Sequence, residues 1–323
     1  MTSYIFRRLL LILPTLFGII LINFVLVQFV PGGPIEQIIS QLQGQGDVFE
    51  NISSGSLETT NTKPEIAVIL GSGLTNFFEP QNIIKEIPYT DLPEFPQPTV
   101  KGHAGKLVLG NIADKKIVCM YGRSHIYEGH EPNSLAKPIR VLKDIGCKLL
   151  IVTNAAGSLD EKMPAGSLMA ISDHINWSGY NPLIGKNQDE YGPRFHDMSD
   201  GYHKFYRDQL LGTANKTNQQ IFEGIYCMYS GPNFETPAEI NALKVIGGNA
   251  VGMSTVPEVL VANHCELSVI AISVITNLAA GMNKTKLSHK ETLENASLAE
   301  ENILQLIKNF ITEVTFDDSS GNN

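Results

Sequence analysis

Cysteine is scarce in this sequence, and its few copies are scattered. The chain of 323 residues has four cysteines, Cys119, Cys147, Cys227 and Cys265, and none of them lies in a C-x-x-C pair. Zinc sites and redox dithiols usually contain such close pairs. We therefore expect no metal site and four reduced, largely buried thiols.

Basic residues are also few. The chain has 24 Lys and Arg against 33 Asp and Glu, which gives a formal net charge of −9. Proteins that bind the phosphate backbone of a nucleic acid need clustered Lys and Arg. We therefore expect no nucleic-acid partner.

Several nucleotide-binding and catalytic motifs are incomplete. The G-S-G at residues 71–73 lacks the third glycine of a dinucleotide fingerprint, because Asn76 stands in its place. Gly105-Lys106 is followed by Leu107, where a nucleotide-phosphate loop has Ser or Thr. No serine lies in a G-x-S-x-G elbow. The sequence thus argues against a dinucleotide enzyme, a P-loop enzyme and a serine hydrolase of that type.

A histidine cluster also differs from a common metal motif. His125, Glu128 and His130 are spaced H-x-x-E-x-H, whereas H-E-x-x-H is the spacing that places two imidazoles on one helical face. Arg123 lies two residues before His125, and a guanidinium suits a tetrahedral oxyanion. The segment therefore favours an anion site over a metal site, with an exposed basic turn as the simpler alternative.

One long apolar run lies near the start of the chain. Arg7 and Arg8 precede an uncharged stretch, Leu9–Val30, which at about 1.5 Å per residue is long enough to cross about 30 Å of hydrocarbon. The run is longer than the apolar core of a signal peptide, and no small-x-small cleavage site follows it. We expect residues 9–30 to form one transmembrane helix, with a cleaved signal as the alternative.

The first 46 residues resemble the first helix of a peptide-transporter permease. The resemblance is carried by F-R-R-L-L at 6–10, P-T at 14–15 and F-V-P-G-G-P at 29–34. A permease needs several helices to enclose a path, so one such helix does not predict transport. Residues 47–63 are typical of a linker. A large domain is expected at 64–316, followed by a disordered tail at 317–323.

Apolar runs alternate with helical segments in the large domain. We expect strands at 65–70, 107–112, 116–120, 148–153, 222–229 and 269–276. Helices are expected at 134–146 and after two cap sequences, T-P-A-E at 236–239 and S-H-K-E at 288–291. This order predicts an α/β sheet flanked by helices, with ligands beyond the strand ends.

Polar and small residues follow these apolar runs. Ser72, Asn154-Ala155, Glu235 and Asn277 each come at or just after the end of an expected strand. Hydroxyls, small residues, an Arg, a His, an aromatic ring and a carboxylate suit a site that grips an oxyanion beside a flat, hydrogen-bonding ring. Taken singly, Glu235 could be a solvated charge near a helix start, and Asn277 could merely end its strand.

The ordered motifs resemble the trimeric purine nucleoside phosphorylases, from about Pro64 to about Val314. They are G-S-G at 71–73, R-S-H-I-Y-E-G at 123–129, T-N-A-A-G at 153–157, G-P-N-F-E-T at 231–236 and V-G-M-S-T-V-P-E at 251–258. The resemblance implies a mixed central β-sheet flanked by helices. It implies phosphorolysis of inosine, guanosine or xanthosine, or their deoxy forms, to free base and ribose 1-phosphate in purine salvage. No cofactor is implied, since inorganic phosphate is a co-substrate.

The resemblance also assigns roles to residues. The implied phosphate ligands are Ser72, His103, Arg123, His125, Ser254 and the backbone N–H of Ala155, with Glu128 as support. The implied ribose neighbours are Tyr127, Met253 and His289, and the implied purine neighbours are Phe234, Glu235 and Asn277. Phe195 would reach into a neighbouring subunit's site, which implies a homotrimer. Asn277, Glu235 and His125 are the residues expected to be catalytic.

The implied chemistry needs no covalent enzyme intermediate. Asn277 is expected to donate to purine N7 as the base becomes anionic, and Glu235 to accept from N1–H of a 6-oxopurine. Bound phosphate would stabilise the cationic sugar and attack it. Two alternatives stay open: a nucleoside hydrolase, although an Asp-rich calcium loop is missing near the first strand, and a membrane-anchored nucleoside-binding protein without turnover.

The N-terminal segment raises a question of location. Arg7 and Arg8 precede the apolar run and no Lys or Arg follows until Lys63, so the positive-inside rule places the N-terminus in the cytoplasm. A spanning helix would send the large domain to the far side, while the resemblance implies a cytoplasmic enzyme. We expect membrane attachment through residues 9–30 and a catalytic domain in the cytoplasm, with the side left open. The family's usual N-terminal helix has no clear counterpart.

Overall fold

The computed structural model describes residues 63–100, 102–282 and 289–317. The expected transmembrane helix at 9–30, the permease-like segment and the tail from residue 318 lie outside these residues, as do the linker up to residue 62 and the cap residue Ser288. Within the described ranges, no helix is both long enough and apolar enough to cross a membrane.

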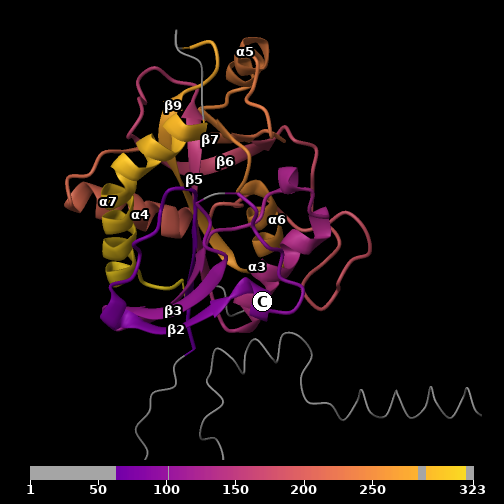
Figure 1. Cartoon of the computed structure of the whole chain (residues 1–323), viewed down its shortest axis with the longest axis vertical. Helices are drawn as coiled ribbons and strands as arrows, with labels where there is room; N and C mark the ends of the chain where they lie inside the picture. Colours follow the sequence, from indigo (N-terminus) through magenta and orange to yellow (C-terminus); the bar gives the residue numbers. More distant parts are fainter. Residues whose placement is uncertain (1–62, 101, 283–288, 318–323) are drawn as a thin grey trace, which may run out of the picture. The chain divides into compact units, whose positions relative to one another are not determined.

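The described residues form a nine-stranded mixed sheet (Figure 1). Its strands are β1 (Ile66–Leu70), β2 (Ile83–Pro88), β3 (Lys106–Ile112), β4 (Lys115–Tyr121), β5 (Leu149–Ser158), β6 (Leu168–Asn176), β7 (Ile221–Met228), β8 (Ala250–Gly252) and β9 (Ser268–Leu278). The order across the sheet is β2-β3-β4-β1-β5-β8-β7-β6-β9. The predicted mixed sheet is therefore confirmed.

The sheet closes on itself at one end. β9 pairs with β6 at the end of the order and also runs parallel to β5 along ten residue pairs, from Leu149↔Ser268 to Ser158↔Leu278. The strands β5, β8, β7, β6 and β9 thus form a ring, and β2, β3, β4 and β1 extend from it as an arm. The sequence pattern does not predict this closure.

Four neighbouring strands share one direction. β4 and β1 are parallel, β1 and β5 are parallel, and β5 and β9 are parallel. Because the carboxyl ends of parallel strands meet at one edge of a sheet, the segments that follow them are brought together. This edge positions the candidate site.

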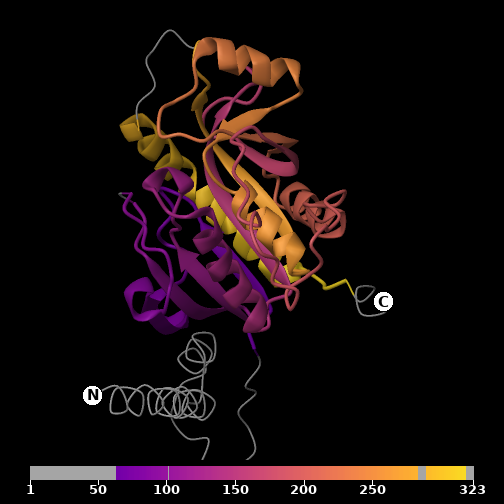
Figure 2. The same ribbon diagram turned by 90° about the vertical axis from the view of Figure 1, so that its right-hand side faces the viewer.

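Helices cover the sheet on both sides. They are α3 (Ala136–Asp144), α4 (Lys204–Lys216), α5 (Pro237–Val245), α6 (Val256–His264) and α7 (His289–Glu313), with short 3₁₀ turns η1 (Pro80–Asn82), η2 (Tyr89–Asp91), η3 (Ile126–Glu128) and η4 (Pro132–Leu135). Figures 1 and 2 show α7 on one side of the sheet and α3 with α6 on the other. α4 packs against α7, and α3 packs against α6.

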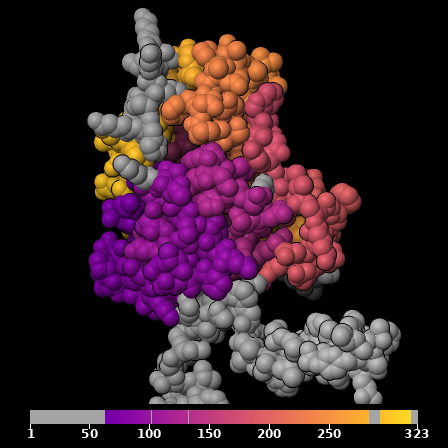
Figure 3. Space-filling view, turned by 45° about the vertical axis from the view of Figure 1, so that its right-hand side comes forward, coloured from indigo at the N-terminus to yellow at the C-terminus, as the bar shows by residue number. Residues whose placement is uncertain are grey.

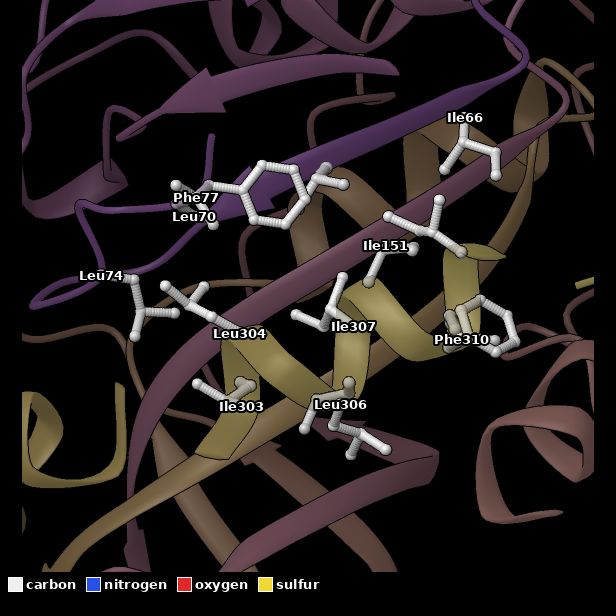
Figure 4. Close-up of a cluster of buried hydrophobic side chains, with 14 of the residues drawn as sticks. Ile66, Leu70, Leu74, Phe77, Ile151, Ile303, Leu304, Leu306, Ile307 and Phe310 are labelled. Atoms are coloured by element: carbon white, nitrogen blue, oxygen red, sulfur yellow. The ribbon is translucent and has the colours of Figure 1, made fainter. Parts of the chain in front are cut away.

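The largest apolar cluster lies between α7 and the sheet (Figure 4). Ile303, Ile307 and Phe310 repeat at helical spacing on one face of α7, and each is fully buried. They pack with Ile66 and Ile151 of the parallel strands β1 and β5. Burying a side chain of this size contributes about 1.5–3 kcal/mol, so this layer fixes the strands whose ends carry the site.

Most expected elements are present, with shifted ends. The expected hairpin is confirmed, since β3 and β4 pair antiparallel through Ile112↔Lys115. The expected cap of α5 is confirmed, because the Thr236 hydroxyl and the Glu239 carboxylate form a capping box. The expected helix at 134–146 begins instead with the 3₁₀ turn η4. All four cysteines are free and buried, as expected.

Candidate active site

The site begins where the four parallel strands end. Arg123 follows β4, Ser72 follows β1, and Asn277 is the second-last residue of β9. The strand expected to end at residue 153 continues to Ser158, so 154–157 lie in β5 and are not a turn. Asn277 likewise lies inside its strand, which corrects the expectation that it follows one. The continuous strands give these side chains a rigid base.

β8 adds a further segment from the opposite direction. It pairs antiparallel with the end of β5 through Gly157↔Val251 and Ser158↔Ala250. The chain then continues past Gly252 to Ser254 beside β5. There, the Asn154 amide donates to the Thr255 hydroxyl at 2.8 Å. Ser254 is thereby fixed next to the end of β5.

Arg123 is the cation of the site, and it is buried. Its side chain is 4% exposed, and it forms an ion pair with Glu258 of α6 at 3.3 Å. Its second terminal nitrogen donates to the Thr153 carbonyl of β5 at 2.6 Å. The alternative of an exposed basic turn is therefore wrong.

His103 orders the Ser72 hydroxyl. Its Nδ1 lies 3.4 Å from the backbone N–H of Arg123, and its Nε2 lies 3.1 Å from Ser72 Oγ. When Nδ1 accepts from that N–H, a neutral ring carries its proton on Nε2 and donates it to Ser72. The serine proton is then available to a ligand. His103 contacts Ser72 and is not among the residues that line the cavity, so its expected contact with phosphate stays a prediction.

His125 is oriented by a carboxylate. Its Nδ1 lies 2.8 Å from Glu128 Oε1, and Glu128 also accepts from the Thr99 hydroxyl at 2.6 Å. Burial lowers the pKa of His125, and this outweighs the raising effect of Glu128. Burial raises the pKa of Glu128, but the hydrogen bonds from His125 and Thr99 outweigh it and lower the pKa to about 2. Near neutral pH the pair is a neutral imidazole held by an ionised carboxylate.

Phe234, Glu235 and Asn277 also line the cavity. Glu235 is 6% exposed, so the alternative of a solvated charge is wrong. Burial raises the pKa of its carboxyl and the nearby Glu239 adds to this, which together outweigh the lowering effect of a hydrogen bond from the residue's own backbone N–H. Among the described residues, no other residue donates a hydrogen bond to this carboxylate. Such a desolvated acceptor favours a ligand that brings its own N–H donor.

Asn277 is locked in one orientation. Its Oδ1 accepts from the Thr276 hydroxyl at 2.8 Å, and its Nδ2 donates to the Leu278 carbonyl at 3.0 Å. An amide nitrogen has two protons, so one remains for a ligand. A Cβ at Gly157 would lie 3.2 Å from Asn277 Nδ2, so glycine leaves room for this amide.

These groups surround one cavity of about 300 Å³. Ten of the expected residues line it: Ser72, Arg123, His125, Tyr127, Ala155, Phe234, Glu235, Met253, Ser254 and Asn277. The rings of His125 and Tyr127 stack at 4.8 Å between centroids. In Figure 3 the orange part of the chain that includes α5 lies above the indigo and purple part, residues 63–130. The cavity is lined from both parts.

Two further expected residues are not among those described as lining the cavity. Phe195 is 91% exposed and does not line this cavity. His289 begins α7, but its side chain lies outside the described residues.

Sequence reasoning missed several residues of the site. Val100, Pro232 and Thr292 also line the cavity, and Glu258 pairs with Arg123 behind it. For Glu258 a signal was present: Thr255-Val256-Pro257-Glu258 has the hydroxyl, proline and carboxylate of a helix start, like Thr236–Glu239. Val100 and Thr292 carry no such signal.

Residues 65–312 match the family described as "Phosphorylase superfamily". The chain is 47% identical over 247 residues to purine nucleoside phosphorylase 1 of Geobacillus stearothermophilus, covering 76% of this chain and 90% of that protein. The chain belongs to the purine nucleoside phosphorylase family.

Solved structures agree with this family membership. The Schistosoma mansoni purine nucleoside phosphorylase in complex with inosine is 32% identical, with a TM-score of 0.76 over 88% of this chain and 97% of that chain. The same organism's enzyme in complex with adenosine is 37% identical, with a TM-score of 0.74 over 80% of this chain and 94% of that chain. The sheet and helices described above thus have the fold of these phosphorylases.

Proposed function

We propose that this chain cleaves purine nucleosides with inorganic phosphate, yielding free base and ribose 1-phosphate in purine salvage. The proposal rests on one observation. A single cavity is lined both by a buried guanidinium with hydroxyl and imidazole groups and by a desolvated carboxylate with an ordered amide. An anion and a purine held by these groups would lie side by side.

The phosphate end supplies positioned donors. Arg123, Ser72 and Ser254 would donate to phosphate oxygens, together with the backbone N–H of Ala155. Neutral His125 presents Nε2, which accepts from a P–O–H group. Donors already oriented before the ligand arrives lower the cost of reorganisation during the reaction. The phosphate is thereby held as a nucleophile.

The reaction then needs no nucleophile from the protein, because phosphate attacks the sugar. A phosphate oxygen forms a bond to ribose C1′ while the bond from C1′ to purine N9 breaks, and the bonding pair moves into the base. The free Asn277 N–H would donate to N7 and stabilise this negative charge, and the base then takes a proton from solvent. Removing one such donor typically costs about 3–4 kcal/mol in the barrier.

The purine end favours 6-oxopurines such as inosine and guanosine, with xanthosine as a further candidate. Their N1–H donates to the Glu235 carboxylate, whereas adenine N1 offers only a lone pair and leaves two acceptors facing each other. A buried mismatch of this kind costs about 1–3 kcal/mol. The Schistosoma mansoni structure with adenosine shows binding to that enzyme, so turnover is the quantity that tests this preference.

We also propose a homotrimer. Phe195 is a large apolar side chain left 91% exposed, which supports the expectation that it covers a neighbouring subunit's cavity. Sedimentation of the full-length chain should give three copies per particle. A fully active monomer would contradict the assembly.

Membrane attachment through residues 9–30, with a cytoplasmic catalytic domain, remains a prediction because that segment lies outside the described residues. Fractionation of cells followed by protease treatment of the intact cells tests both parts. Full-length chain in the soluble fraction would contradict the anchor. Active domain that is accessible only from outside would contradict the cytoplasmic placement.

The sugar product tests the proposed function. With inosine and phosphate, phosphorus NMR should show ribose 1-phosphate appearing in equal amount to hypoxanthine. A nucleoside hydrolase would release free ribose instead. A binding protein without turnover would release no base, and either result would reject the proposal.

A further inference from the structure

A carboxylate that does not line the ligand cavity holds the cation of the phosphate end. Glu258 lies in the first turn of α6, four residues after Ser254. The same short segment therefore places a hydroxyl in front of the cavity and a carboxylate behind it. Its side chain is 10% exposed, and its partner Arg123 is 4% exposed.

The guanidinium of Arg123 is held at two points. One terminal nitrogen lies 3.3 Å from Glu258 Oε1, and the other donates to the Thr153 carbonyl at 2.6 Å. Because the guanidinium is planar with a fixed set of N–H directions, contacts from α6 and β5 at its two ends fix the plane. The directions in which the remaining N–H groups point are then set before any ligand binds.

Arg123 lies on the border of two cavities. It lines the ligand cavity of about 300 Å³, and it also lines a smaller cavity of about 20 Å³ together with Ser124 and Glu258. Ser124 Oγ, Glu258 Oε2 and Arg123 Nε are buried and have no hydrogen-bond partner among the residues that the structure describes. The small cavity has room for one water molecule to bridge such groups. The small cavity behind the arginine is thus lined mostly by apolar side chains, with Arg123, Ser124 and Glu258 among its few polar ones.

We propose that Glu258 is a positioning residue for phosphate: it sets the orientation of Arg123 and does not contact the substrate. The inference rests on the proposed function, since it takes Arg123 as the phosphate ligand. A purely structural ion pair would affect folding and leave the relative use of the two substrates unchanged. Substituting a positioning residue weakens phosphate binding more than it changes the KM for the nucleoside.

The direction of the change in phosphate affinity distinguishes an orienting role of Glu258 from a purely electrostatic one. A carboxylate near an anion repels it, so removing the charge alone would tighten phosphate binding. Loss of orientation acts in the opposite direction, because the guanidinium no longer points its N–H groups at the anion. Glu258→Gln removes the charge and keeps the shape, so the two effects compete in one variant.

The experiment compares full-length wild type with Glu258→Gln. Calorimetric titration with inorganic phosphate, without nucleoside, should show a dissociation constant raised about 10- to 100-fold, as expected for a weakened hydrogen bond to a charged group. The KM for inosine at saturating phosphate should change less than about twofold. The inference would be overturned if the dissociation constant for phosphate were unchanged or lowered. It would also be overturned if that constant and the KM for inosine rose by the same factor.

Two further variants keep the test decisive. Glu223→Gln is the matched control, because Glu223 pairs with Arg207 at 2.7 Å and neither residue lines the ligand cavity; its phosphate constant should equal that of wild type. If Glu258→Gln does not fold, Glu258→Asp decides, since it keeps the charge but shortens the reach. Its phosphate constant should be raised, and an unchanged value would overturn the inference.

The experiments distinguish failure of the proposed function from failure of the positioning role of Glu258. Wild type that binds phosphate without phosphate-dependent turnover would reject the phosphorylase assignment, while the comparison of phosphate constants would still decide the role of Glu258. Wild type that turns over normally beside an unaffected Glu258→Gln would reject the positioning role alone.

Discussion

The two ends of the cavity are built in different ways. At the phosphate end each side chain has a protein partner behind it: Arg123 has Glu258, His125 has Glu128 and Ser72 has His103. At the purine end the Glu235 carboxylate has no such partner among the described residues, and Phe234 is 37% exposed. Asn277 at the purine end is also oriented by protein partners, so the difference between the two ends lies in the Glu235 carboxylate, which pairs with the ligand.

The difference follows from what each end has to recognise. Phosphate is charged and compact, so oriented donors that need no rearrangement bind it well and keep stabilising it during the reaction. A purine is identified by the positions of its donors and acceptors, and a buried acceptor without a partner rejects bases that lack the matching donor. We therefore expect substitutions at the phosphate end to reduce activity for every nucleoside, and those at the purine end to change which nucleoside is used.

The largest effect is expected for Arg123→Ala. Loss of the buried guanidinium should lower kcat/KM for phosphate about 10³-fold. It should also lower the free energy of unfolding by about 3 kcal/mol, because Glu258 is left buried without its partner. Activity assays and denaturant titration measure the two effects.

The double variant Arg123→Ala/Glu258→Gln is the control for this prediction. Removing the unpaired charge should restore most of the stability and none of the activity. Recovery of activity together with stability would mean that the arginine matters for folding alone.

The next effect is expected for Asn277→Ala. Loss of the donor to N7 should lower kcat for inosine about 10²-fold, with little change in the phosphate constant. Asn309→Ala on α7, an amide that pairs with Gln305, is the matched control and should retain full activity. A change in phosphate binding alone would place Asn277 at the wrong end.

Asn277→Asp should relax the preference against adenosine, since the carbonyl oxygen of a protonated carboxyl can accept a hydrogen bond from the 6-amino group.

Glu235→Gln should change selectivity more than rate. The amide can donate to adenine N1 and accepts only weakly from N1–H of inosine, so the ratio of inosine to adenosine turnover should fall about 10- to 100-fold. Steady-state kinetics with both nucleosides measure this ratio. An unchanged ratio would contradict the assignment of Glu235 to the base.

The same variant should be more stable than wild type. The pKa of Glu235 is raised by burial, so the folded state binds the proton more tightly than the unfolded state, and the ionised carboxyl destabilises the folded chain at pH 7. A neutral amide removes this cost, and the gain should be about 0.5–1 kcal/mol. Equal or lower stability in denaturant titration would contradict the desolvated carboxylate.

A further effect is a dependence of stability on pH. Burial lowers the pKa of His125, His174, His196 and His264. Below pH 6.5 the unfolded chain therefore binds protons that the folded chain does not, and stability should fall as the pH falls from 6.5 toward these lowered values. Each histidine changes the free energy of unfolding by at most about 1.4 kcal/mol per pH unit. Denaturant titrations of phosphate-free protein at pH 7 and 5.5 would show it, and His125→Gln should reduce the slope.

Much of the fold was predictable because its strands are apolar runs. β1 is fully buried and β5 and β9 are buried along most of their length, and such runs are recognisable in sequence. β2 alternates exposed residues with half-buried or buried ones, and β8 has three residues, so neither stands out. The closure of β9 onto β6 depends on pairings between distant segments, which local patterns do not encode.

The site was predictable where its residues lie in ordered motifs. Ten of the expected side chains line one cavity, because their motifs follow strands that the sheet brings together. Glu258 was missed as a functional residue because it acts through Arg123, 135 positions away in the chain. The burial of Glu235 was also hidden, since a carboxylate before a helix start is normally solvated.

The central claim is that phosphate is the second substrate, held by Arg123 and its neighbours. The most direct test is the initial rate of hypoxanthine release from inosine while inorganic phosphate is titrated upward from zero. The account predicts a rate that is negligible without phosphate and saturates as phosphate fills the site. A rate that is equally high in phosphate-free buffer would contradict it.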